Sequence, residues 1–109
     1  MSSAIPVTTS TFRTEVLQSA VPVIVDLWAP WCGPCRVMSP VLDELAGEYA
    51  GRVKVVKVNV DEEPNLAAAF QVQGIPTLAL VRQSAVVDRQ VGFTGRAQVA
   101  QLFARAAAG

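Results

Sequence analysis

The pattern of apolar and polar positions predicts a helix and then a buried strand near the start of the chain. Hydroxyl side chains at 8–10 can cap a helix, and the apolar positions that follow have helical spacing. These positions are Phe12, Val16, Leu17 and Ala20. After Pro22 comes an almost unbroken, β-branched apolar run at 23–29 that contains a single carboxylate, Asp26. Such a run is typical of a central strand covered on both faces.

The rest of the pattern predicts alternating helices and strands, ending in a hairpin. A long helix is expected after the cysteine segment, because the apolar residues that follow would share one helix face. That face consists of Met38, Val41, Leu42, Leu45 and Tyr49. A valine-rich strand at 53–60 precedes a short helix that opens at 61–64 with acidic residues and proline. Strands at 77–81 and 86–91 can pair across residues 83–85. Thr94 can cap a last helix, whose apolar face is Val99, Leu102, Phe103 and Ala106.

This order of elements predicts an α/β fold. Strands that alternate with helices require parallel pairing and crossover helices, and the closing hairpin adds antiparallel pairing. We therefore expect a central mixed β-sheet flanked by helices. No repeat or linker interrupts the pattern, so residues 1–109 are predicted to form a single domain.

Composition and charge narrow the range of partners. About half of the 109 residues are apolar, and the formal net charge is zero. No basic block indicates binding to nucleic acid or to an anionic membrane, and no apolar stretch reaches the roughly 20 residues of a membrane span. The sequence shows no signal peptide, and its two cysteines cannot form a secreted disulfide framework. We therefore expect a cytoplasmic protein.

The clearest chemical motif is Cys32-Gly33-Pro34-Cys35, between the first buried strand and the long helix. Two cysteines three residues apart can form or break a disulfide with little backbone movement. If Cys32 lies at the helix N-terminus, free N–H groups and the helix dipole stabilise its thiolate, which is the attacking species. Pro34 is suited to the first helical turn, and Gly33 leaves room for an incoming disulfide.

Other interpretations of the cysteine pair remain open at this stage. A zinc site needs four ligands, and the chain has two cysteines and no histidine, so only a site shared between subunits is possible. A structural disulfide across so short a loop removes little chain entropy. A chance pairing of cysteines in a loop is the third alternative. A strand, C-x-x-C and a helix in that order favour a redox motif.

Asp26 and Lys57 are the other candidate ionisable residues. A carboxylate buried in an apolar strand should have a raised pKa, and beneath the cysteines it could accept the proton of Cys35. Asp26 could equally face solvent or hydrogen-bond to backbone. Lys57 could lie beside Asp26 if their strands are neighbours, or it could be an ordinary edge lysine.

These residues closely resemble those of the thioredoxin family. The resemblance rests on Trp31-Cys32-Gly33-Pro34-Cys35, on Asp26 in its strand, and on Gly74-Ile75-Pro76 and Val91-Gly92 at the expected separations. It covers nearly the whole chain, from about Phe12 to Phe103. The resemblance implies the thioredoxin fold and protein disulfide reductase activity, with no bound cofactor or metal.

The resemblance also implies a role for each site residue. Cys32 would attack the substrate disulfide, Cys35 would resolve the mixed disulfide, and Asp26, helped by Lys57 or a water, would take the proton of Cys35. Pro76 would follow a cis peptide bond. The substrate-binding surface would comprise Trp31, Gly33, Pro34, Gly74, Ile75, Pro76, Gly92 and Phe93.

Partners are implied in the same way. An NADPH-dependent flavoprotein, thioredoxin reductase, would re-reduce the pair. Substrates would be disulfide-containing proteins such as ribonucleotide reductase, peroxiredoxins and methionine sulfoxide reductases, and the protein would be a monomer. A Gly-Pro dipeptide and the absence of a histidine beside the second cysteine favour a reductase over an oxidase.

Two departures from the family pattern affect the expectations. Phe93 stands where a small residue is common, so a redox protein dedicated to one partner is an alternative. A second alternative function is a binding subunit that does not catalyse disulfide exchange. Gln83-Ser84 replaces an Asn-Gly type turn, so the hairpin loop is expected to differ from the favoured primed turn.

Overall fold

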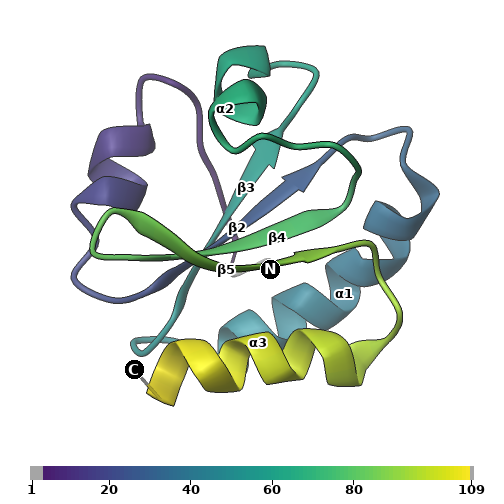
Figure 1. The fold of residues 1–109 in the computed structure, drawn as a ribbon. Coiled ribbons are helices and arrows are strands. Elements are labelled where there is room, and N and C mark those ends of the chain that lie inside the picture. Colours follow the sequence, from purple (N-terminus) through teal and green to yellow (C-terminus); the bar gives the residue numbers. More distant parts are fainter. Residues whose placement is uncertain (1–3, 109) are drawn as a thin grey trace.

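A five-stranded mixed sheet forms the centre of the fold (Figure 1). The structure is a computed structural model, and it describes residues 4–108. The strands are β1 (Ile5–Pro6), β2 (Val23–Trp28), β3 (Lys54–Asn59), β4 (Thr77–Arg82) and β5 (Ala85–Val91). In the order β1-β3-β2-β4-β5, β3 is parallel to β1 and β2, and β4 is antiparallel to β2 and β5. The predicted mixed sheet with a closing hairpin is confirmed.

Helices cover both faces of the sheet. They are η1 (Arg13–Leu17), α1 (Gly33–Glu48), α2 (Pro64–Ala69) and α3 (Arg96–Ala108). In Figure 1, α1 and α3 lie together below the sheet and α2 lies above it. Because crossovers put helices on the faces, the central strand β2 is shielded on both sides.

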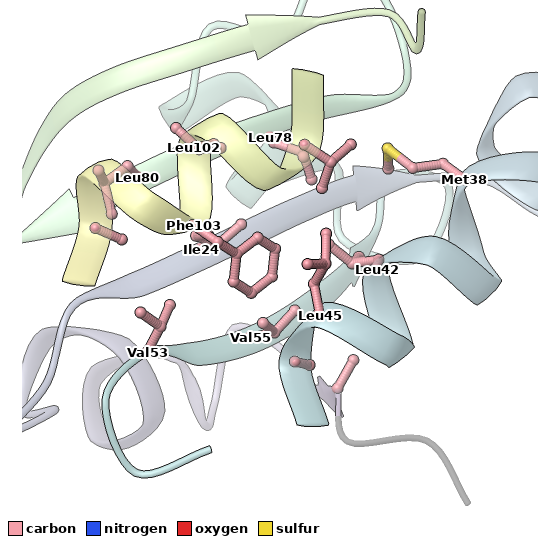
Figure 2. Close-up of a cluster of buried hydrophobic side chains, with 14 residues drawn as sticks. Ile24, Met38, Leu42, Leu45, Val53, Val55, Leu78, Leu80, Leu102 and Phe103 are labelled. Carbon is pink, nitrogen blue, oxygen red and sulfur yellow. The ribbon is translucent and has the colours of Figure 1, made fainter. Parts of the chain in front are cut away.

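Side chains that alternate along β2 supply two separate cores. Ile24 packs with Leu42 of α1 and Phe103 of α3, and Figure 2 shows this cluster between the sheet and the two long helices. Val25, in contrast, belongs to a second cluster with Val16 of η1. Complete burial of one such side chain stabilises the fold by roughly 1.5–3 kcal/mol. The strand that carries Asp26 is thus held rigidly from both faces.

The first helix differs from the prediction. Only Val16 of its expected apolar face is buried, while Leu17 is 38% exposed and Ala20 is also exposed. The segment closes a hydrogen bond from Gln18 N–H to the Arg13 carbonyl at 2.9 Å, five residues back, which makes η1 a π-helix. A π-helix has more residues per turn than an α-helix, so the spacing used for the prediction does not apply.

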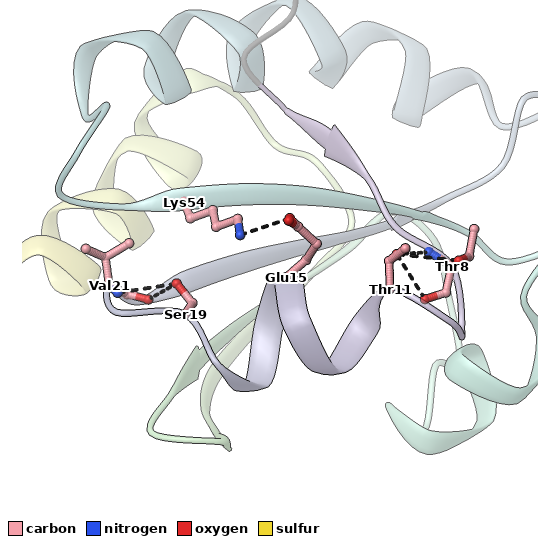
Figure 3. A network of polar contacts seen from close by, with 6 residues as sticks. All are labelled: Thr8, Thr11, Glu15, Ser19, Val21 and Lys54. Atoms are coloured by element: carbon pink, nitrogen blue, oxygen red, sulfur yellow. Dashed lines mark hydrogen bonds and ion pairs between the residues drawn. The ribbon is translucent and has the colours of Figure 1, made fainter.

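Polar contacts hold this first segment in place (Figure 3). Glu15 of η1 accepts a hydrogen bond from Lys54 Nζ of β3 at 3.2 Å. Thr8 N–H donates to Thr11 Oγ1 at 2.9 Å before the helix, and Ser19 Oγ donates to the Val21 carbonyl at 2.8 Å after it. These polar contacts fix the ends of the segment and tie it to β3, in addition to the apolar packing of Val16.

The hairpin turn also differs from the expectation. Its loop consists of Gln83 and Ser84 alone, because Ala85 already belongs to β5. Both loop residues have positive φ, 52° and 67°, which is the signature of the favoured primed turn. The expected departure from that turn is therefore wrong, since the strand pairing on either side imposes the primed geometry on residues that do not prefer it.

The short strand β1 and the start of helix α3 complete the fold. The two-residue strand β1 pairs with Val56 and Lys57 of β3 and is too short to give a periodic signal in the sequence. Thr94 joins the start of α3 through Gln98, whose Oε1 accepts from the Thr94 N–H at 2.7 Å and from its hydroxyl at 3.1 Å.

Candidate active site

The cysteine pair lies where the chain enters α1 from β2. Cys32 is the N-cap of the helix, Cys35 lies in its first turn, and the two form a disulfide with their Cα atoms 5.3 Å apart. The Cys35 backbone N–H donates to Cys32 Sγ at 3.2 Å. Pro34 occupies the same turn, where its missing N–H leaves no helical hydrogen bond unmade. The predicted position of Cys32 at a helix N-terminus is confirmed.

The disulfide is packed against apolar residues, and the space next to Gly33 is open. Both cysteines are 4% exposed and pack with Ala29, with Ile75 against them from the facing loop. Gly33 is exposed, and a side-chain carbon added to it would meet no atom within 4 Å. An incoming chain can therefore approach the pair over Gly33.

Asp26 is buried and shares a cavity with Cys35. Its side chain is 2% exposed, and Oδ1 has no hydrogen-bond partner. Burial raises the pKa of Asp26 from 3.8 to about 7; the positive charge of Lys57 opposes this shift and the negative charge of Asp43 adds to it. The structure thus favours the buried, titrating Asp26 over the alternative of a solvent-facing carboxylate.

Lys57 is the register partner of Asp26 on the neighbouring parallel strand. It is half-buried, and β3 lies between β1 and β2, so the alternative of an edge lysine does not apply. Lys57 Nζ lies 4.6 Å from the centre of the Trp28 ring and donates to Ser39 Oγ at 3.5 Å. The ammonium is thereby placed at the wall of the cavity that holds Asp26 and Cys35.

The loop before β4, which contains Ile75 and Pro76, brings Ile75 against the cysteines. The Ile75–Pro76 peptide bond is cis, as the resemblance implies. The Thr77 hydroxyl donates to the Gly74 carbonyl at 2.6 Å, and the Gly92 N–H donates to the Pro76 carbonyl at 2.8 Å. Gly92 has a φ of 83°, which a glycine adopts without steric cost. These bonds fix the loop that faces the disulfide.

The predicted surface residues differ in exposure. Trp31 is 67% exposed, and its Nε1–H donates to Asp61 Oδ2 at 2.8 Å. Gly33 and Pro34 are exposed as well, whereas Pro76 is buried. Phe93 is half-buried and packs against the core cluster between the sheet and helices α1 and α3, so only part of it faces outward.

Comparison with known proteins agrees with this geometry. The family model for Thioredoxin matches residues 3–105. The chain is 52% identical to Thioredoxin 1 from Nostoc sp., over 93% of this chain and 94% of that protein. It is 58% identical to the thioredoxin from Thiocapsa roseopersicina over 77% and 92% of the two chains, and 47% identical to that of Haemophilus influenzae over 92% and 94%.

The chain belongs to the thioredoxin family. Thioredoxins act with thioredoxin reductase and with disulfide-containing substrates. Membership and the cysteine pair at bonding distance together support protein disulfide reductase activity, with a redox-active disulfide between Cys32 and Cys35. Within residues 4–108, no group of three or more His, Cys, Asp or Glu side chains is placed to hold a metal ion. None of the helices described is long and apolar enough to cross a membrane.

The structure adds two residues to the thioredoxin site that the sequence motifs did not single out. Val60 packs beside the cysteines, and Ser39 lines the cavity of Asp26. Val91, part of the Val91-Gly92 motif but not predicted to bind substrate, is 60% exposed and lies 3.4 Å from where a side chain on Gly74 would begin. The sequence could have indicated Ser39, since it follows Cys35 by four residues and therefore lies on the same helix face.

Proposed function

We propose that this chain reduces disulfides in other proteins, with Cys32 as the nucleophile and Cys35 as the resolving thiol. The observation that carries the assignment is the position of Cys32 at the N-cap of α1, where Cys32 Sγ accepts the Cys35 N–H. A thiolate at that place is stabilised by the hydrogen bond and by the helix dipole, which lower the pKa of a cysteine.

The two steps of the exchange balance without a further oxidant or reductant. The Cys32 thiolate attacks one sulfur of the substrate disulfide, so a mixed disulfide forms and the other substrate sulfur leaves as a thiolate. Cys35 then loses its proton and attacks Cys32 Sγ, which releases the second substrate thiolate. Two electrons have passed to the substrate, and the Cys32–Cys35 disulfide described here is the oxidised product.

Asp26 is the proposed acceptor of the Cys35 proton. Its pKa near 7 means that it can bind a proton and release it at neutral pH. It shares a cavity with Cys35, so proton transfer needs no passage through the apolar core. Lys57 supports the charged form of Asp26 through its nearby positive charge.

The proposed substrate-binding surface surrounds the opening above Gly33. It comprises Trp31, Gly33, Pro34, Gly74, Ile75, Pro76, Gly92 and Phe93. An extended substrate strand could use the backbone of the Ile75 loop, whose shape is fixed by the bonds at Gly74 and Pro76. Because Phe93 packs against the core, less of its side chain is available to contact a dedicated partner, so a general reductase is favoured.

The remaining proposals follow from family membership. NADPH would supply the electrons through a flavoprotein thioredoxin reductase, and ribonucleotide reductase, peroxiredoxins and methionine sulfoxide reductases are candidate substrates. We propose that the protein acts as a cytoplasmic monomer and that its residues form one thioredoxin domain.

The test is insulin disulfide reduction with dithiothreitol as the reductant. The wild-type protein should accelerate precipitation of the insulin chains, and Cys32→Ser should abolish the acceleration although serine still caps α1. A folded wild-type protein that gives no acceleration over dithiothreitol alone would refute general reductase activity.

A further inference from the structure

A cavity of about 70 Å³, lined mainly by residues with polar side chains, lies next to Cys35. A water molecule needs only about 10–15 Å³ of such space, together with two to four polar partners. The walls supply these partners and consist of Asp26, Trp28, Cys35, Arg36, Ser39 and Lys57. The cavity therefore has the size and polarity of a hydration site.

Ser39 occupies a particular place in this wall. It lies on α1 one helical turn after Cys35, so both side chains project from the same face of the helix. It is half-buried and accepts a hydrogen bond from Lys57 Nζ at 3.5 Å. Lys57 Nζ also sits over the Trp28 ring, which restrains the ammonium. A serine hydroxyl that accepts from an ammonium keeps its own proton free to donate elsewhere.

Asp26 Oδ1 supplies the complementary group. It is buried, it lacks a hydrogen-bond partner, and it lines the same cavity. A buried acceptor without a partner destabilises the fold, so a donor in the cavity is favoured. The charged groups that act on Asp26 are Lys57 from β3 and Asp43 from α1, and Arg36 also lines the cavity.

We propose that Ser39 is a positioning residue that orients a water between Cys35 Sγ and Asp26 Oδ1. The water accepts from the Ser39 hydroxyl and from the Cys35 thiol, and it donates to Asp26. When Cys35 is deprotonated, its proton passes to the water as the water gives one of its own to Asp26. The step yields a Cys35 thiolate, a neutral Asp26 and an unchanged water. This inference rests on the proposed roles of Cys35 and Asp26.

The test follows the reaction of the reduced protein with 5,5′-dithiobis(2-nitrobenzoate) by stopped flow. Attack by Cys32 releases the first thionitrobenzoate at a rate proportional to reagent concentration. Resolution by Cys35 releases the second at a rate independent of it. Ser39→Ala should slow the second release about tenfold, a modest part of the 10²–10⁴-fold that a positioned proton acceptor provides. The first release should change less than about twofold, because Ser39 does not act on Cys32, and Ser39→Thr should restore the second.

The variant Asp26→Asn separates the proposed role of Ser39 from the proposed role of Asp26. If Asp26→Asn slows the second release and Ser39→Ala adds nothing in that background, both residues act on one proton transfer. If Ser39→Ala slows both releases equally, leaves the second unchanged, or retains its full effect without Asp26, the role of Ser39 is refuted while that of Asp26 stands. If Asp26→Asn leaves the second release unchanged, the roles of both Asp26 and Ser39 are refuted.

Discussion

Asp26 and Lys57 are register partners on adjacent parallel strands, yet Lys57 Nζ lies over the Trp28 ring and beside Ser39. The carboxylate is therefore influenced by a positive charge while its Oδ1 stays without a hydrogen bond. A close ion pair would lower the pKa of Asp26 and hold it ionised. The observed arrangement leaves burial as the dominant effect, so Asp26 can change its protonation state near neutral pH.

The pH dependence of stability tests the protonation of Asp26. Its pKa rises from 3.8 to about 7 on folding, so the folded state binds the proton more tightly, and ionisation destabilises the fold between those pH values. The stability of Asp26→Asn relative to wild type should grow from pH 4 to pH 8 by about 2–4 kcal/mol and then level off. Urea unfolding at pH 4, 6 and 8 measures this difference. The exposed Glu62→Gln is the control, and a difference for Asp26→Asn that stays constant with pH would contradict the assignment.

Trapping of a mixed disulfide tests which cysteine attacks. In Cys35→Ser the backbone N–H that binds Cys32 Sγ is retained, so attack should proceed while resolution is lost. Non-reducing electrophoresis with insulin should then show an adduct at least about tenfold more abundant than with wild type. Cys32→Ser should give none. An adduct that forms through Cys35 would reverse the assigned roles.

A matched pair of valines tests the substrate surface. Val91 and Val87 are both on β5 and are 60% and 51% exposed, but only Val91 adjoins the Gly74 loop. Loss of an apolar contact worth about 1 kcal/mol would raise KM for insulin about fivefold in Val91→Ser and leave kcat unchanged. Val87→Ser should behave as wild type. Equal effects of the two changes would mean that the surface does not extend to Val91.

The hairpin turn offers a stabilising substitution. Ser84 has a φ of 67°, a conformation that is costly for any residue with a side chain. Ser84→Gly should raise the free energy of unfolding by about 1 kcal/mol, less a little for its long hydrogen bond to the Leu17 carbonyl at 3.4 Å. Ala85→Gly, in the adjoining strand, should lower it by about 0.5–1 kcal/mol. Chemical denaturation measures both, and a destabilised Ser84→Gly would contradict the strain assigned to the turn.

The parts of the fold that the sequence predicted are those with a strong periodic signal. The run at 23–29 is the central strand β2, and the stripe from Met38 to Leu45 faces the core. The first helix was mispredicted, because a π-helix breaks the spacing by which Leu17 and Ala20 were assigned. β1 contains two residues and owes its pairing to β3, which a local pattern does not reveal.

The site shows the same division between local and tertiary information. The cysteine motif and its helix N-terminus follow from adjacent residues. The burial of Asp26, the position of Lys57 over Trp28 and the contact with Ser39 depend on how β2, β3 and α1 pack together. Sequence spacing alone left Asp26 and Lys57 with two interpretations each, and the packing of β2, β3 and α1 decides between them.

The capping of α1 by Cys32 makes one sulfur atom both a reactive group and a structural one. An ionised sulfur is a better acceptor for the Cys35 N–H than one held in a disulfide, so reduction should tighten the first turn of the helix. Comparison of Cys32→Ser with Cys32→Ala in reduced protein isolates the structural part, which for an N-cap is about 1 kcal/mol. An interaction that stabilises the start of α1 more strongly in the reduced protein than in the disulfide form therefore also favours reduction, so helix stability and electron affinity are thermodynamically coupled.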